Sequence, residues 1–153
     1  MSVSLTDKEG DGSSNVELVE KAKKPKLNNF RGVFMRDELN FVPTLNECGM
    51  LNLNTSNEPG SHWVCWFKRG DEKCYFDSFA VTAPREVVEY LKPPIIYSTC
   101  QIQGFNDTNC GQWCLYVVNE LNRKRLFSDI VLDLVNAVRR GKRKIKELSK
   151  QPT

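Results

Sequence analysis

Apolar and polar residues alternate in several short runs along this chain. The run at 49–54 alternates, and aromatic-rich runs follow at 62–68 and 73–79, separated by the polar, glycine-containing loop 69–72. Alternation with a period of two is typical of a strand with one buried face, and two such runs around a short loop indicate a β-hairpin. A further buried strand is predicted in the segment 93–98, beginning after its two prolines.

Other segments repeat their apolar residues every three or four positions, as amphipathic helices do. This spacing predicts helices at 82–91, from Cys110 to Leu121 and at 128–138, and the apolar cluster at 28–39 is predicted to be a short helix. Strands and helices in this arrangement indicate an α+β fold, with a small, mostly antiparallel sheet packed against helices.

Charge and composition divide the 153 residues into three parts. Residues 1–26 have few large apolar side chains, which predicts a disordered N-terminal segment. Residues 27–138 hold the apolar runs and are predicted to form one domain. Residues 139–153 hold seven basic residues and one acidic residue, so the net charge of +3 comes from a predicted solvated basic tail. The tail either contacts DNA non-specifically, through residues 139–150, or only keeps the chain in solution.

The sequence also bears on compartment and metal content. No apolar run approaches the roughly 20 residues that span a membrane, and the polar start has no signal-peptide core. The protein is therefore expected to be intracellular, neither secreted nor membrane-bound, with its six cysteines mostly reduced. Zinc could in principle be held by Cys65, Cys74, Cys110 and Cys114, but structural zinc sites are typically built on C-x-x-C pairs, which this chain lacks. No metal is therefore expected.

His62 is the only histidine, so any mechanism that needs an imidazole near neutral pH depends on it. If the hairpin loop holds an even number of residues, His62 lies opposite Asp77 or Phe79, and in either register His62 and Asp77 project from the same face. A carboxylate beside an imidazole holds its tautomer and stabilises the imidazolium. An odd loop would put them on opposite faces, and a lone histidine or a strand-end aspartate is more often structural.

Cys110 stands where a run of loop-forming residues gives way to a predicted helix. A helix N-terminus favours thiolate over thiol, and its free N–H groups can donate to a developing oxyanion. Gly111 leaves room for the backbone of a substrate, although glycine is also common after a helix start without any function. Cys110 is therefore predicted to be an exposed thiol in which the thiolate is favoured, whereas Cys65, Cys74 and Cys114 are interpreted as buried, inert thiols.

In chain order, His62, Asp77, Gln103 and Cys110 form a set that resembles the adenain superfamily of cysteine proteases. This superfamily contains the adenovirus maturation protease, proteins of virus-like (Polinton/Maverick-type) DNA transposons and the proteases that process ubiquitin-like proteins. The stretches "HWVCWF", "CYFDSF" and "QGFNDTNCGQWC" resemble its histidine strand, its acidic strand and its segment with Gln ahead of a Cys-Gly pair. The resemblance covers roughly residues 30 to 135.

The resemblance implies a papain-related fold and gives each member of the set a role. Cys110 is expected to be the nucleophile, His62 its general base, Asp77 the residue that orients His62, and Gln103 a side-chain donor to the oxyanion. Adenain itself has Glu at the acidic position, but both acids occur in the superfamily. The chain is shorter than adenain, which leaves activation by DNA or by a peptide an analogy only, and the sequence requires no cofactor.

Substrates in the superfamily usually carry a small residue, often glycine, before the cleaved bond. The resemblance therefore implies a narrow slot lined by Trp63, Gly111 and Trp113, although both tryptophans suit core packing equally well. The expected function is a thiol-dependent endopeptidase that cleaves polypeptides after small residues and matures viral or transposon capsid precursors. It is expected to act as a monomer, in the host nucleus or the virion if the protein is viral.

Two alternatives stay open at this point. One is a protease that removes ubiquitin-like modifiers, because nothing in the sequence resolves the choice of substrate. The other is a non-catalytic nucleic-acid-binding module with structural thiols, against which the intact set of four roles argues.

Overall fold

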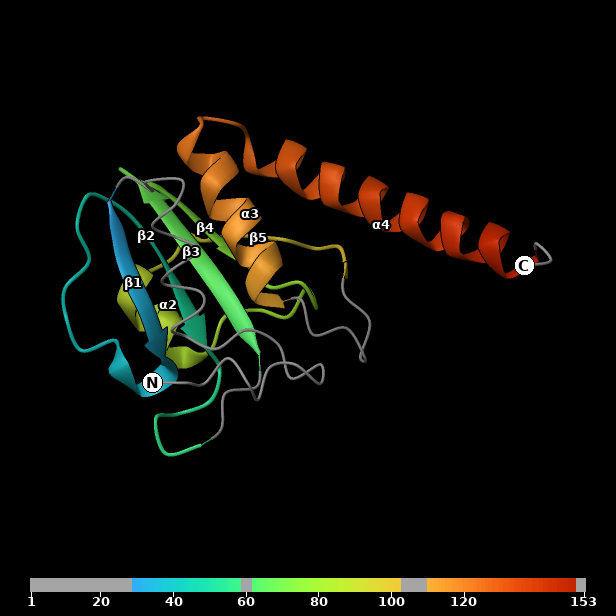
Figure 1. The fold of residues 1–153 in the computed structure, drawn as a ribbon. Coiled ribbons are helices and arrows are strands. Elements are labelled where there is room, and N and C mark those ends of the chain that lie inside the picture. Colours follow the sequence, from blue (N-terminus) through green and yellow to red (C-terminus); the bar gives the residue numbers. More distant parts are fainter. Residues whose placement is uncertain (1–28, 59–61, 103–109, 151–153) are drawn as a thin grey trace.

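The computed structural model describes residues 29–58, 62–102 and 110–150, with side chains described as far as Gly141. The predicted disordered segment 1–26 lies outside the described residues. Within the described part, one sheet carries helices on both faces (Figure 1).

Five strands lie in the sheet in their chain order. They are β1 (Phe30–Met35), β2 (Asn46–Asn52), β3 (Trp63–Arg69), β4 (Glu72–Phe76) and β5 (Ile96–Tyr97). The three central strands pair antiparallel, as predicted, whereas β1 and β5 run parallel to their neighbours and make the sheet mixed.

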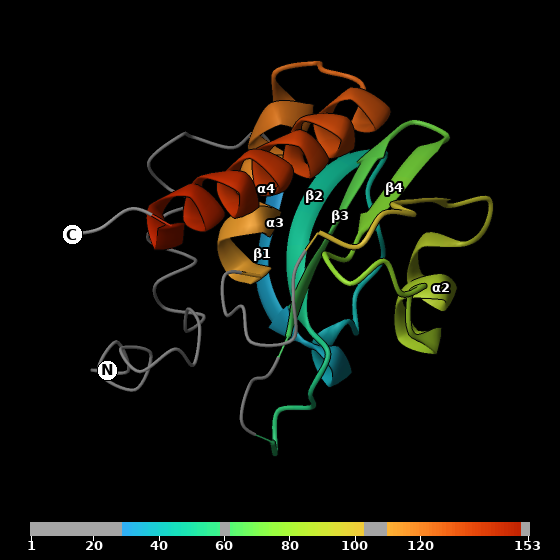
Figure 2. The same cartoon turned by 90° about the vertical axis from the view of Figure 1, so that its right-hand side faces the viewer.

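The helices divide between the two faces of this sheet. They are the short 3-10 helix η2 (Arg36–Glu38) and the α-helices α2 (Arg85–Leu91), α3 (Cys110–Asn122) and α4 (Phe127–Lys150). Figure 2 shows α3 and α4 over one face and α2 on the opposite side. Along β3, Cys65 and Phe67 belong to the core under α3 and α4, whereas Val64 and Trp66 belong to the core on the α2 side. The central strand is thus buried on both faces.

The loop of the hairpin between β3 and β4 holds an even number of residues, which was the condition for placing His62 and Asp77 on one face. Arg69 pairs with Glu72, which leaves a two-residue turn, and Cys65 pairs with Phe76 further along. Gly70 in this turn has φ +60°, a left-handed conformation that glycine adopts without strain. This register continues the strands toward the residue before β3 and the residue after β4, and it positions the site described below.

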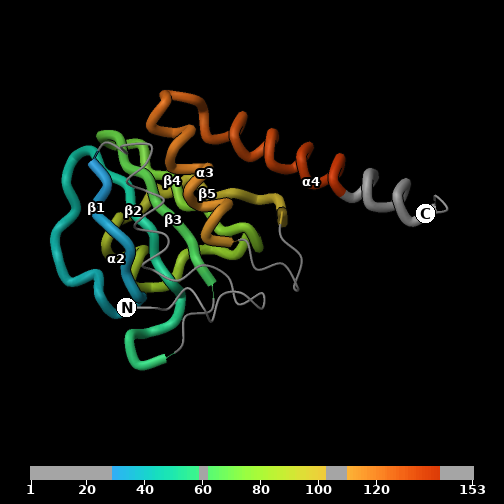
Figure 3. The backbone as a smooth tube through the Cα atoms, viewed as in Figure 1, coloured from blue at the N-terminus to red at the C-terminus, as the bar shows by residue number. Residues whose placement is uncertain are grey.

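The segment predicted as a short helix at 28–39 is mostly the strand β1, so that prediction is wrong. Gly32 has φ +134°, and the register between β1 and β2 shifts between Phe30 and Val33. Such a bulge adds a residue to the strand and breaks its period-two alternation, which is why the sequence did not indicate a strand. After β1 the chain turns through η2 and comes back to start β2 parallel to β1 (Figure 3).

The buried strand predicted after the two prolines of 93–98 is also partly wrong. Only Ile96–Tyr97 forms a strand, β5, and Ile96 is 49% exposed because β5 lies at the edge of the sheet. The two prolines that precede it have no N–H to donate to a sheet ladder, which shortens the strand.

Helix α4 continues to Lys150, so the predicted basic tail from Arg139 begins inside a helix. Lys and Arg, which make up seven of the residues from 139 to 150, have high helix propensity. Earlier in α4, which includes the predicted helix 128–138, Phe127, Ile130 and Leu134 are buried against the core. In the described part of the chain, no helix has both the length and the apolar character needed to cross a membrane.

Candidate active site

The hairpin brings His62 and Asp77 together. His62 directly precedes β3 and Asp77 directly follows β4, and Nε2 of His62 lies 2.6 Å from Oδ1 of Asp77. The two side chains are 11% and 1% exposed, so their contact is largely shielded from water. The placement of both residues on one face, which the sequence predicted for an even loop, is confirmed by the register.

Asp77 is held by a tight turn and by the segment after β5. Its Oδ1 also accepts from the Phe79 N–H at 2.8 Å, and its carbonyl oxygen accepts from the Ala80 N–H at 2.8 Å. The hydroxyl of Ser98 donates to the Asp77 carbonyl at 3.2 Å and accepts from the Asp77 N–H at 3.3 Å. The backbone of Asp77 is therefore fixed on two sides, and its carboxylate has little freedom to leave His62.

Cys110 is the first residue of α3, where the sequence predicted a helix start. Its side chain is only 4% exposed, so the prediction of an exposed thiol is wrong. The physical reason is close packing of α3 against the sheet: the Trp63 N–H donates to Sγ of Cys110 at 3.4 Å. Since Trp63 follows His62, this bond places the sulfur next to the residue that carries the imidazole.

The pKa of His62 reflects both neighbours. Burial by itself lowers this pKa, but hydrogen bonds to Asp77 and to Cys110, together with electrostatic interactions with both groups, raise it to about 9. Because Nε2 faces Asp77, Nδ1 is the ring nitrogen left for Cys110. The imidazole thus lies between the carboxylate and the sulfur and is protonated at neutral pH.

The other sheet and helix thiols are core residues, as interpreted from the sequence. Cys65, Cys74 and Cys114 are at most 1% exposed, and Cys114 donates to the Trp63 carbonyl at 3.4 Å. Burial raises the pKa of Cys74 to about 12 and that of Cys114 well above its ordinary value, which keeps both as inert thiols. Among the described residues, no group of three or more His, Cys, Asp or Glu side chains is placed to hold a metal ion.

The remaining predicted site residues are placed less directly. Gln103 lies outside the described residues. Gly111 is buried in the first turn of α3, and Trp63 is 4% exposed and part of the core. Trp113 is partly buried against the same core and lines a cavity of about 630 Å³ between α3 and α4. Trp63 is not among the described residues that line that cavity, and a slot for a small residue stays a prediction.

Two residues of the site were not assigned by sequence analysis. The ring of Phe79 stacks on the imidazole of His62, and Ser98 holds the backbone of Asp77. The register that places Phe79 opposite His62 was one of two that the sequence allowed, so the sequence could have indicated this contact. Nothing in the sequence could have indicated the role of Ser98, because its position depends on how β5 pairs with β4.

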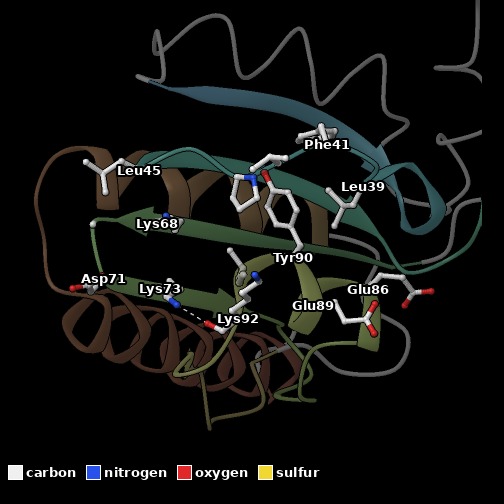
Figure 4. Close-up of a pocket in the computed structure, with 14 residues that line it drawn as sticks. Leu39, Phe41, Leu45, Lys68, Asp71, Lys73, Glu86, Glu89, Tyr90 and Lys92 are labelled. Atoms are coloured by element: carbon white, nitrogen blue, oxygen red, sulfur yellow. Dashed lines mark hydrogen bonds between the residues drawn. The ribbon is translucent and has the colours of Figure 1, made fainter.

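A second large cavity lies away from this site. It measures about 600 Å³ and is lined by the loop after η2, by α2 and by the hairpin turn (Figure 4). Phe41 and Tyr90 supply apolar and aromatic surface, and Lys73 Nζ donates to the Lys92 carbonyl at 2.5 Å across one side. None of its lining residues belongs to the group around His62, because it lies at the other end of the hairpin.

Comparisons with known proteins complete the description of the fold. No protein-family model matches this chain, and no curated protein matches it in sequence. The solved structures that match its fold include a crystal structure of ASFV pS273R protease, with a TM-score of 0.59, and a selenomethionine crystal structure of the same protein, with 0.57. Each is 17% identical in sequence to this chain and matches 80% of it.

The similarity establishes the fold alone, and the chemistry has to be inferred from the geometry of the site. The chain spans about three fifths of those two structures, 61% and 62% of their lengths. The predicted α+β fold class is confirmed, since the five-stranded sheet with its helices matches the architecture of that protease.

Proposed function

We propose that this chain is a cysteine protease with Cys110 as its nucleophile. The observation that carries the proposal is the position of His62, whose Nε2 bonds to Asp77 while its other side faces the sulfur of Cys110. A thiol nucleophile, a base in contact with it and a third group that orients the base are the parts that acyl transfer requires. The similarity in fold to ASFV pS273R protease supports this assignment.

The chemistry follows from these contacts. With a pKa of about 9, His62 is an imidazolium at neutral pH, and a cation beside the sulfur stabilises the thiolate. The thiolate attacks the carbonyl carbon of a peptide bond, and the imidazolium then gives its proton to the amine that leaves. The acyl group stays on Cys110 as a thioester. Neutral His62 takes a proton from water, which hydrolyses the thioester and restores the pair.

The carbonyl oxygen becomes negatively charged during the attack and needs donors. The start of α3 supplies them in this proposal, because the first N–H groups of a helix have no partner within the helix. The resemblance to adenain adds the side chain of Gln103. Asp77 keeps the imidazole in the orientation that serves both steps.

We propose a polypeptide substrate with a small residue, of the glycine type, before the cleaved bond. This specificity and a role in maturing viral or transposon capsid precursors rest on the resemblance to the adenain superfamily. A viral role also agrees with the similarity in fold to a protease of ASFV. The seven basic residues in 139–153 support non-specific contact with DNA by the C-terminal end of α4.

The test uses the full-length chain and its own cysteines. Iodoacetamide is added at several pH values between about 6 and 8, and the alkylation rate at each cysteine is read by mass spectrometry of peptides. Cys100 is exposed and serves as the ordinary thiol in the same molecule. In the proposed mechanism the His62 cation favours the thiolate of Cys110, so the ratio of the Cys110 rate to the Cys100 rate is expected to be highest at the lowest pH.

The same sample is then incubated with a peptide library. Cleavage is expected to disappear in Cys110→Ala and to persist in the matched control Cys100→Ala. If alkylation at Cys110 rises with pH as it does at Cys100, and Cys110→Ala leaves cleavage unchanged, the assignment is wrong and a non-catalytic module is supported. The residues preferred at the cleaved bond separate capsid precursors from ubiquitin-like proteins as substrates.

A further inference from the structure

We propose that Phe79 is a positioning residue for the general base His62. The Phe79 ring lies against the face of the imidazole, with ring centroids 4.4 Å apart and planes inclined by 20°. This inference rests on the proposed function, because it assigns Phe79 a role in the reaction of Cys110. Phe79 acts through His62, so it is not itself a catalytic residue.

The backbone makes this contact specific to the turn after β4. The Phe79 N–H donates to Oδ1 of Asp77, the same oxygen that lies 2.6 Å from Nε2 of His62. The Ala80 N–H donates to the Asp77 carbonyl and closes the turn. One four-residue turn therefore presents both a carboxylate to the edge of the imidazole and an aromatic ring to its face.

Two contacts at right angles restrict the imidazole more than one can. The bond to Asp77 alone leaves the ring of His62 free to tilt about the axis through Nε2. The stacked ring of Phe79 opposes this tilt, so that Nδ1 keeps pointing toward Cys110. Because general base catalysis depends on the geometry of proton transfer, a loss of this restraint is expected to lower kcat. KM is expected to stay constant, since Phe79 acts on the base.

The aromatic face also favours the charged form of His62. A cation over an aromatic ring is attracted by its π electrons, and an apolar side chain of similar size lacks that attraction. The titratable groups that face His62 are Asp77 at the end of β4 and Cys110 at the start of α3. Replacement of Phe79 by leucine keeps most of the apolar volume and both of these partners, and it removes only the π face.

The experiment uses the lone histidine as a spectroscopic probe in the full-length chain. His62 gives the only histidine signals in an NMR titration, so its pKa is read without assignment. Phe79→Leu is expected to lower this pKa by about half to one unit and to lower kcat about tenfold with KM unchanged. Phe79→Tyr retains the π face and is expected to restore both values. Val81→Ala, at a 58% exposed position two residues further on, is the matched control.

The outcomes separate this inference from the proposed function. If wild-type protein cleaves peptides and Phe79→Leu changes neither the pKa of His62 nor kcat, the role of Phe79 is overturned and the protease assignment stands. If wild-type protein cleaves nothing, the proposed function fails, while the shift in the pKa of His62 still tests the contact. If Phe79→Leu does not fold, the pKa of His62 is measured in Phe79→Tyr and Phe79→Trp. Both variants keep an aromatic ring, so the pKa should stay at or above its wild-type value, and a lower pKa would overturn the role of Phe79.

Discussion

His62 and Asp77 meet at the open end of the hairpin, where Nε2 lies 2.6 Å from Oδ1 although the two residues come from different strands. The register of the hairpin brings this pair together: a two-residue turn aligns β3 with β4, and His62 and Asp77 lie just beyond the paired residues on one face. The hairpin places the base and its orienting acid at the ends of β3 and β4, and α3 places Cys110 at its first residue.

Asp77→Asn tests the dependence of His62 on its partner. The amide oxygen can still accept from the Phe79 N–H, so the turn is expected to persist. The pKa of His62 is expected to fall, because a neutral amide no longer stabilises the imidazolium, and kcat/KM for peptide cleavage is expected to fall on the order of a hundredfold or more. The measurements are an NMR titration and steady-state kinetics at several pH values. Activity within twofold of wild type would show that Asp77 does not orient the base.

The raised pKa of His62 also predicts how stability depends on pH. The folded protein binds this proton more tightly than the unfolded chain, whose histidine titrates near the ordinary value of 6.5. The contribution of His62 is therefore complete below about pH 6.5 and is lost as pH rises through about 9, and it amounts to on the order of 3 kcal/mol. Urea unfolding of wild type and His62→Gln across this range measures it. The difference between the two free energies of unfolding should shrink with rising pH, and a constant difference would contradict the raised pKa.

The part of the site that the sequence predicted is the part carried by local patterns. Aromatic and β-branched runs around a short loop indicated the hairpin, and the sequence placed His62 and Asp77 on one face on the condition of an even loop, which the structure shows. The change from loop formers to an apolar stripe located the start of α3 at Cys110. These signals are local, because a turn, a period and a helix start each depend on neighbouring residues.

What the sequence did not predict depends on contacts between distant segments. The bulge at Gly32 hid β1, since it removes the alternation on which a strand prediction depends. Burial of Cys110 follows from the packing of α3 on β3, and the hydrogen bonding of Ser98 to the Asp77 backbone follows from the pairing of β5 with β4. No periodicity in the sequence records such contacts.

Gly49→Ala tests the packing of the sheet on the α2 side. A Cβ at position 49 would clash with Cη2 of Trp66, and the indole cannot swing away because its Nε1 donates to Glu47 at 2.8 Å. The free energy of unfolding is expected to fall by about 1–3 kcal/mol, as for other overpacked cores. Thermal and urea unfolding measure this loss. Peptide cleavage per folded molecule should stay at the wild-type level, since the clash is on the face opposite Cys110.

Gly141→Ala is the matched control for this substitution. It lies in α4, is exposed, and its Cβ would meet nothing within 4 Å. Alanine has a higher helix propensity than glycine, so stability is expected to stay constant or to rise by up to about 1 kcal/mol. Equal losses in Gly49→Ala and Gly141→Ala would show that the effect comes from removing glycine and has nothing to do with Trp66.

Glu47 is a buried carboxylate that joins three parts of the chain on this same side. It is 2% exposed, and Oε2 accepts from Trp66 Nε1 at 2.8 Å and from the Tyr90 hydroxyl at 2.5 Å. Oε1 lies 3.1 Å from Nη1 of Arg31 and accepts from the N–H of Thr44. Burial alone would raise the pKa of Glu47, but these donors outweigh it and lower the pKa. The proton is therefore bound more weakly in the folded state, and the stability that Glu47 contributes is lost as pH falls through its folded pKa.

Glu47→Gln is expected to reduce the free energy of unfolding by about 2–4 kcal/mol at neutral pH, because an amide NH₂ would face a donor where the carboxylate accepted. Urea unfolding at neutral and acidic pH measures this loss, which should shrink as the wild-type carboxylate becomes protonated. Glu89→Gln is the matched control: Glu89 is 66% exposed in an ion pair with Arg85, and its loss should cost less than about 1 kcal/mol. If the two substitutions cost the same, Glu47 does not stabilise the α2 side of the sheet through its buried hydrogen bonds.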